Sequence, residues 1–328
     1  MRKADDAPWA WSVFWHSDQL QSCMPVSEPD ASDQLFATWR AFFDALPAGA
    51  RILDLGTGNG SLAAQAVAVS KTKPERFSIH GVDLADIDPQ RFVTSAADLL
   101  REVTFYPRTP MEKLPFNDEH FDAVGSQYGL EYSDTKESVA EALRVLKPGG
   151  FFRFLLHADD GVLKDRCQLQ SRQAGTILDS SLFDRLADLL KKLVKAETQH
   201  TTENTAAATQ AITALKGVLD ELEQGFADDE DRSLVQNLFA AVRSLPEMRK
   251  SHQLEALLVM TNDIRDLLVA QSRRLQAMQQ AALDDAAANA LAGQLRELGA
   301  DNVTLERAVA GKQRNCVGFW LHGGKAST

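Results

Sequence analysis

The feature that most constrains the fold of this chain is a short apolar segment that ends in three alternately spaced glycines. Residues 51–60 read RILDLGTGNG, and Ile52–Leu55 is predicted as a buried parallel strand. A helix is expected to follow, with Ser61 or Asn59 available near its N-terminus as a cap. Glycine allows positive φ and lets a ligand approach the backbone, while a helix N-terminus offers N–H groups and a favourable dipole. The stretch therefore predicts a ligand cradle beyond the end of a strand.

Strand and helix patterns alternate on either side of a long helical stretch. Further strands are predicted at residues 77–83, 103–106, 121–126, 151–156, 302–309 and 315–321. Helices are predicted at residues 89–101, 134–146 and 286–298, the second of them closed by the breaker sequence 147–150. Residues 302–321 form a hairpin with a turn at Gly311. This order predicts right-handed βαβ units and a parallel sheet that is finished by an antiparallel end.

The stretch from about residue 165 to residue 285 has leucines at helical spacing and no strand pattern. Ser244–Glu247 resembles a capping box with proline in the first turn, so a long helix is expected to begin there. The predicted domains are an aromatic-rich helical cap (1–49), a core (50–160), a helical insertion (161–285) and a C-terminal part that completes the core sheet (286–328). The insertion is expected to act as a lid or to pair two subunits.

Aromatic residues are concentrated before the first strand. Phe36, Trp39, Phe42 and Phe43 lie at helical spacing within residues 32–46, which predicts a helix packed on the core. The earlier cluster, Trp9–Trp15, precedes any core element. It is either a lid over a binding site or an anchored tail, and the sequence leaves both interpretations open.

Charge and cysteine content limit the classes of partner. The net charge of −11 argues against a broad nucleic-acid surface, because phosphate affinity comes from clustered lysine and arginine. Cys23, Cys167 and Cys316 lie far apart without metal-ligand spacing, which indicates a reduced protein and no metal site. No apolar run reaches the length of a signal peptide core or a membrane span. We therefore expect a soluble, cytoplasmic protein that does not bind membranes.

Four segments in this order and spacing resemble the class I S-adenosylmethionine-dependent methyltransferases. They are ILDLGTGNG, the strand ending at Asp83, MEKLPFNDEHFDAV and LRVLKPGG. The resemblance covers residues 50–157, resumes at 286–321, and implies a Rossmann-like, seven-stranded, mostly parallel sheet with an antiparallel C-terminal strand. A nicotinamide or flavin domain would instead require G-x-G-x-x-G and a second βαβαβ half, and Ser61 stands where its last glycine would be.

The resemblance implies where S-adenosylmethionine would bind. Asp83 would hold the ribose hydroxyls, a role that its distance along the chain from Gly56 also favours. Pro110 replaces the aspartate that many relatives use for the adenine amino group, so Thr109 and Glu112 are the alternatives. The complete set of expected cofactor-binding residues is Asp54, Gly56, Thr57, Gly58, Gly60, Asp83, Leu84, Met111, Glu112 and Gln127.

The acceptor side is expected at the loop after the fourth strand, beside the end of the fifth strand. His157, Tyr128 and Glu131 are the candidate catalytic residues, although His157 could instead be a structural histidine at a strand end. Trp11, Trp15, Tyr128 and Tyr132 are the candidate substrate-binding residues.

The absence of Asn/Asp-Pro-Pro-Tyr/Phe and Pro-Cys motifs favours methyl transfer to a small molecule over nucleic-acid methylation. Two alternatives stay open. One is a catalytically silent cofactor-binding scaffold whose helical insertion binds a protein partner, and the other is an RNA methyltransferase with a local basic patch. A homodimer through the insertion is also expected.

Overall fold

The computed structural model describes residues 7–22 and 29–327, and the chain divides into two compact units. The first unit runs through Asp165 and resumes at Ala277, and the second comprises Arg166–Gln276. Helices α7 (Val162–Asp179) and α11 (Leu254–Ala281) carry the chain across these two boundaries. The compact helical unit is thus shorter than the segment 161–285 that we predicted as an insertion.

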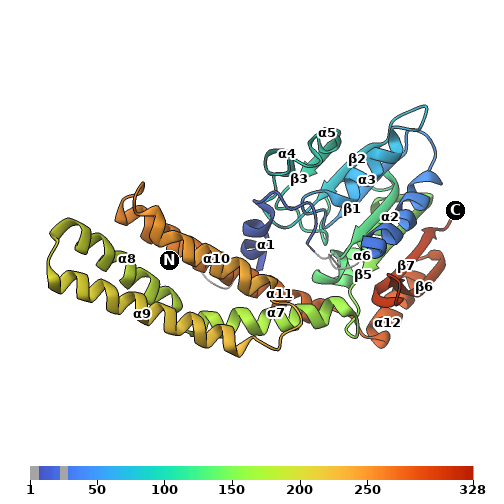
Figure 1. Ribbon diagram of the computed structural model, residues 1–328. Coiled ribbons are helices and arrows are strands. Elements are labelled where there is room, and N and C mark those ends of the chain that lie inside the picture. Colours follow the sequence, from blue (N-terminus) through green and yellow to red (C-terminus); the bar gives the residue numbers. More distant parts are fainter. Residues whose placement is uncertain (1–6, 23–28, 328) are drawn as a thin grey trace. The chain divides into compact units, whose positions relative to one another are not determined.

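A seven-stranded sheet forms the centre of the first unit (Figure 1). Its strands are β1 (Arg51–Leu55), β2 (Ser78–Val82), β3 (Val103–Tyr106), β4 (Phe121–Gln127), β5 (Leu146–Leu156), β6 (Ala300–Ala310) and β7 (Asn315–Lys325). They follow the order β3-β2-β1-β4-β5-β7-β6. The first five strands pair in parallel, whereas β7 runs antiparallel to both β5 and β6. The predicted Rossmann-like, mostly parallel sheet with an antiparallel C-terminal strand is confirmed.

Both faces of this sheet are covered by helices, which explains why every residue of β1 after Arg51 is buried. On one face, Leu53 and Leu55 share a core with residues of α6 (Thr135–Val145) and α12 (Asp285–Glu297). On the other face, α2 (Pro29–Asp44) packs against α3 (Ser61–Ser70), and Trp39 of α2 is fully buried near Gly125. The strand order places the carboxyl ends of β1, β2 and β4 side by side, where open α/β sheets bind ligands.

The predicted helix at residues 89–101 is wrong. The structure has two short helices instead, α4 (Pro89–Phe92) and α5 (Ala97–Leu100). Val93 has extended backbone angles and ends α4, while the backbone and hydroxyl of Thr94 both donate hydrogen bonds to the Asp18 carboxylate. An attachment to the N-terminal segment therefore interrupts a stretch that has helical periodicity.

The helix breaker at residues 147–150 also has a different role from the predicted one. Helix α6 ends at Val145, and the breaker residues belong to β5, which begins at Leu146. The register between β4 and β5 shifts between Phe121 and Ala123, and Gly149 has φ of +73°. The sequence KPGG thus forms an irregularity within the strand, which glycine makes possible.

The second unit is helical throughout. Besides parts of α7 and α11 it contains α8 (Leu182–Gln199), α9 (Thr202–Gly225) and α10 (Ser233–Met248), with an apolar core around Leu186, Phe226 and Phe239. The predicted helix start at Ser244–Glu247 is wrong, because these residues lie in the last turns of α10 and α11 begins only at Leu254. The Ser244 hydroxyl donates to the Ala241 carbonyl instead of capping a new helix.

Three further observations concern the described part of the chain. None of its helices is long and apolar enough to cross a membrane. No group of three or more metal-ligating side chains gathers among residues 7–22 and 29–327. Cys23, one of the three cysteines considered above, lies outside the described residues.

Candidate active site

The glycine turn after β1 has the backbone conformation that its sequence predicts. Gly56, Gly58 and Gly60 have φ values of +65°, +52° and +81°, which residues with a Cβ adopt at a cost. Gly60 is the N-cap of α3 and no side chain caps the helix there, so the expected capping by Ser61 or Asn59 is wrong. An added Cβ on Gly60 would lie 2.8 Å from both Leu100 and Phe105, so this glycine is also required by packing.

Asn59 instead attaches the N-terminal segment to the glycine turn. Its side-chain nitrogen donates to the backbone carbonyls of Trp15, Ser17 and Gln19 at 3.0, 3.1 and 2.8 Å. Since an amide carries two hydrogens, one of them is shared. The preceding helix, α1 (Ala7–Trp15), places the Trp15 ring directly over Gly58, where an added Cβ would overlap the ring. One fully buried side chain in the glycine turn therefore fixes the end of the aromatic helix α1 and the residues that follow it.

Replacing Asn59 with alanine is expected to release this segment. The loss of a buried donor that serves three carbonyls should lower the free energy of unfolding by about 1–3 kcal/mol. Amide hydrogen exchange and limited proteolysis should both become faster within residues 8–22. The matched control is Asn289→Ala, because the exposed amide of Asn289 donates to the carbonyl of Asp285, one turn earlier in α12. Equal protection of residues 8–22 in N59A and the wild type would contradict the attachment.

Two buried acids lie beside the turn. The Asp54 carboxylate accepts a hydrogen bond of 2.6 Å from the Thr57 hydroxyl. The Asp83 carboxylate accepts from the backbone N–H groups of Gly58 and Ala85, each at 2.8 Å. Burial raises the pKa of Asp54 to about 7, although the hydrogen bond from Thr57 opposes this change. Burial likewise raises the pKa of Asp83 to about 6, and its two backbone hydrogen bonds limit the increase. Burial disfavours the ionised form of both carboxylates, so a ligand that offers hydrogen-bond donors or positive charge would stabilise them.

These raised pKa values predict how the stability of the cofactor-free protein depends on pH. In the unfolded chain both aspartates ionise near 3.8, whereas in the folded chain they ionise near 7 and 6. Their contribution to stability is therefore complete below the unfolded pKa and is lost as pH rises through about 6 and about 7. We expect urea unfolding to show a free energy that falls between about pH 4 and about pH 7, and Asp54→Asn to flatten this slope by up to about 1.4 kcal/mol per pH unit. Equal slopes for D54N and the wild type would contradict the assignment.

The residues expected beside adenine, Met111 and Glu112, lie on the loop after β3. Met111 is buried, and Leu84, directly after Asp83, has a half-exposed side chain. The Glu112 carboxylate accepts a hydrogen bond of 3.0 Å from the backbone of Asp134. Thr109 directs its hydroxyl to the carbonyl of Pro107, whereas Glu112 lines the cavity described below.

The loop after β4 positions the acceptor-side residues. Tyr128 has φ of +56°, and its hydroxyl donates to the Val317 carbonyl at 2.9 Å. The short helix η1 (Leu130–Tyr132) follows and carries Glu131, which is 6 % exposed. The Glu131 Oε1 atom accepts from the backbone N–H of His157 at 2.8 Å and from His157 Nδ1 at 2.6 Å. Because a carboxylate only accepts, this contact places a proton on Nδ1 of the imidazole.

Two polar atoms in this loop lack a protein partner. Neither Gln127 Oε1 nor Glu131 Oε2 accepts a hydrogen bond from any residue of the described chain, and both atoms are buried. A buried acceptor without a partner costs free energy, so each of these atoms indicates a place where a ligand donor would fit.

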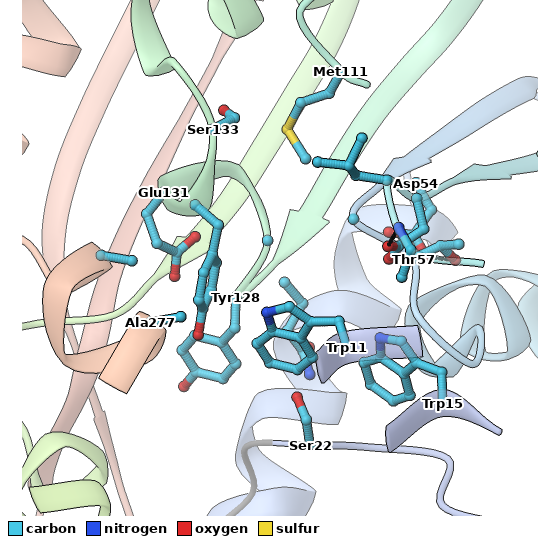
Figure 2. A pocket seen from close by; sticks show the side chains of 18 of the residues that line it. Trp11, Trp15, Ser22, Asp54, Thr57, Met111, Tyr128, Glu131, Ser133 and Ala277 are labelled. Atoms are coloured by element: carbon cyan, nitrogen blue, oxygen red, sulfur yellow. Dashed lines mark hydrogen bonds between the residues drawn. The ribbon is translucent and has the colours of Figure 1, made fainter. Parts of the chain in front are cut away.

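A cavity of about 410 Å³ joins the two sides of the site. Figure 2 shows Asp54, Thr57 and Trp15 on one side and Glu131 and Ala277 on the other, with Trp11 between them. The expected site residues that line it are Trp11, Trp15, Asp54, Gly56, Thr57, Asp83, Leu84, Met111, Glu112, Gln127, Tyr128, Glu131 and Tyr132. Gly58, Gly60 and His157 do not line it: Gly58 lies beneath Trp15, Gly60 caps α3, and His157 lies behind Glu131.

Several lining residues were not predicted from the sequence. Leu20, Gln21 and Ser22 extend the wall that begins with α1, while Ala277, Gln280 and Ala281 come from the end of α11. The backbone of Leu283 exchanges hydrogen bonds with the carbonyl of His157 and the N–H of Asp159 beside β5. No motif marks these residues, because their place in the cavity depends on where a helix returns to the sheet.

Comparisons with known proteins agree with this geometry. The family model for a methyltransferase domain matches residues 53–154. The ubiquinone/menaquinone biosynthesis C-methyltransferase of Ectopseudomonas oleovorans is 36% identical over 120 residues, which are 34% of this chain and 67% of that protein. The dimethylglycine N-methyltransferase of Parasynechococcus marenigrum is 31% identical over 159 residues, which are 46% of this chain and 54% of that protein.

The chain spans about half or less of the length of most curated relatives, for example 40% of the Geobacter sulfurreducens C-methyltransferase, which is 32% identical over 105 residues. Among solved structures, the YcgJ protein of Bacillus subtilis is 25% identical and covers 43% of this chain and 59% of that chain, with a TM-score of 0.33. This TM-score is too low to support an argument, so the assignment to a family depends on the sheet order and the sequence matches. The chain belongs to the class I S-adenosylmethionine-dependent methyltransferases, and its cofactor is S-adenosylmethionine.

Proposed function

We propose that this protein transfers the methyl group of S-adenosylmethionine to a small-molecule acceptor. The observation that carries the proposal is the arrangement around one cavity: a positive-φ glycine turn, the Asp83 carboxylate and the orphaned acceptor of Gln127 all border it. The glycine turn leaves room for the methionine part, Asp83 suits ribose hydroxyls, and Gln127 Oε1 suits the ammonium group. The residues present thus fit the cofactor of the family.

Each protein group has a defined task in this proposal. When bound, the cofactor supplies an electrophilic methyl group on a sulfonium, which is a good leaving group. Asp54 and Asp83 complement its positive charge, and the tryptophans of α1 exclude water from the cavity. Glu131 meets the acceptor, whereas His157 holds the Glu131 carboxylate in place and acts as a positioning residue. Orienting the nucleophile in line with the methyl group then accounts for most of the catalysis.

The relatives include one named as a C-methyltransferase and one named as an N-methyltransferase, so the comparisons support methyl transfer without selecting the atom. The cavity volume of about 410 Å³ lies in the range of small-molecule sites.

We further propose that the helical insertion pairs two subunits. Equal sedimentation of the full chain and a chain with residues 166–276 replaced by a short linker, after correction for mass, would contradict pairing.

Two measurements test the proposed function. Calorimetry should show stoichiometric binding of S-adenosylmethionine and of S-adenosylhomocysteine to the full-length protein. Transfer of a labelled methyl group to components of a small-molecule extract should then depend on the enzyme. Binding without any transfer would support the alternative of a catalytically silent scaffold, and no binding of either molecule would refute both interpretations.

A further inference from the structure

Four of the residues that line the cavity have acidic side chains: Asp54, Asp83, Glu112 and Glu131. No lysine, arginine or histidine of residues 7–22 and 29–327 lines it. Asp54 lies near the end of β1, while Asp83 and Glu112 belong to the loops after β2 and β3, on the cofactor side. Glu131 alone lies on the loop after β4, among aromatic residues. The charge that an acceptor meets is therefore negative.

The Glu131 carboxylate is held at one end and lacks a partner at the other. Two donors of His157, its backbone N–H and Nδ1, fix Oε1. Oε2 is buried and accepts from no described residue. The two bonds to Oε1 fix the orientation of the carboxylate, and the lone pairs of Oε2 stay available to a ligand. A ligand that carries a hydrogen-bond donor, and above all a positively charged one, would satisfy this atom.

Three aromatic residues line the same cavity as Glu131. Trp11 packs edge-on against Tyr132, with ring centroids 5.4 Å apart, and stacks on Trp15 at 5.8 Å. All three rings line the cavity. Aromatic faces attract cations, whereas a carboxylate or phosphate on the acceptor would meet Glu131 without a compensating positive charge.

From these observations, and resting on the proposed function, we propose that the methyl acceptor is an amine, bound as its cation between Glu131 and the aromatic rings. The ammonium donates to Glu131 Oε2 and gives up its proton there. The nitrogen lone pair then forms the N–CH₃ bond as the C–S bond breaks. The electron pair of the C–S bond stays on sulfur and converts the sulfonium to a neutral thioether. Each turnover of a primary or secondary amine releases one proton in total.

The test uses the full-length protein saturated with S-adenosylhomocysteine and four acceptor probes of equal size: benzylamine, benzyl alcohol, benzyl mercaptan and benzoate. Calorimetry should show benzylamine binding about tenfold or more tightly than the alcohol and the thiol, and benzoate more weakly than all three. Glu131→Gln should reduce the amine-to-alcohol preference to about one while keeping the affinity for S-adenosylhomocysteine within about threefold. The matched control is Glu137→Gln, because the exposed side chain of Glu137 does not line the cavity and the variant should keep the amine preference.

The outcomes separate the two proposals. If the wild type does not bind S-adenosylhomocysteine, the proposed function fails and this inference fails with it. If it binds the product but shows no preference for benzylamine, or if E131Q keeps the preference, only the amine inference is overturned. Should E131Q fail to fold, Trp11→Leu decides, because loss of a cation–π contact should reduce the amine-to-alcohol ratio about threefold. An unchanged ratio in W11L would overturn the inference.

Discussion

Replacing Asp83 with alanine is expected to weaken S-adenosylmethionine binding about 100-fold or more. The carboxylate is positioned by two backbone N–H groups at 2.8 Å and borders the cavity, so ribose hydroxyls would reach a preoriented acceptor. Two charge-assisted hydrogen bonds, each worth about 1.5–3 kcal/mol, correspond to this loss of affinity. Calorimetry with the cofactor measures it directly. Asp98→Ala is the matched control, since the Asp98 side chain is exposed and forms an ion pair with Arg101 on the surface.

The same aspartate should make cofactor affinity depend on pH. The ribose hydroxyls bind its ionised form, whose folded pKa is about 6 without ligand. Affinity should therefore be constant well above this pKa and should fall by up to about tenfold per pH unit below it. Asp83→Asn removes this group from titration, so the variant should bind weakly and with a flatter pH profile. A wild-type affinity that stays constant from pH 7 to pH 5 would contradict the role of Asp83.

The sheet could be predicted from the sequence because its strands are determined by local patterns. Apolar runs, a glycine turn and the alternation with helices are all visible within short windows, and the family resemblance adds the antiparallel end. The misplaced helix boundaries have nonlocal causes. Thr94 bonds to Asp18, far away in sequence, and this contact divides a segment of helical periodicity into α4 and α5.

The site was predictable to the extent that single loops define it. Asp83 and Gly56 directly follow strands and Gln127 ends one, so their convergence follows from parallel topology. The attachment of the N-terminal segment by Asn59 was not predictable, because an asparagine in a turn has many local uses. The contribution of Gln280 depends on where α11 ends relative to the sheet, which no short pattern encodes. Likewise, the sequence could not show that Glu131 faces the cavity with His157 behind it.

Replacing Gly56 with alanine is expected to lower the free energy of unfolding by about 2–5 kcal/mol and to disturb both sides of the site together. Gly56 has φ of +65°, and an added Cβ would lie 2.9 Å from Gly129 Cα, a backbone atom that side-chain rotation cannot move away. Gly129 immediately precedes η1, so any displacement would also move Glu131. Urea unfolding measures the loss of stability, and calorimetry should show weaker binding of S-adenosylhomocysteine.

Two matched variants separate the causes of this loss. Gly129→Ala places a Cβ at the same contact, 2.9 Å from the Leu55 carbonyl, but φ at Gly129 is −134°, so only the steric cost of about 1–3 kcal/mol applies. Gly293→Ala lies within α12 with no atom within 4 Å of the added Cβ, and should stabilise the protein by about 0.5–1 kcal/mol. If G56A and G129A were as stable as G293A, the close approach of the β1 and β4 loops would not constrain the site. If both are destabilised, the contact between two glycines aligns the cofactor turn with the loop that carries Glu131.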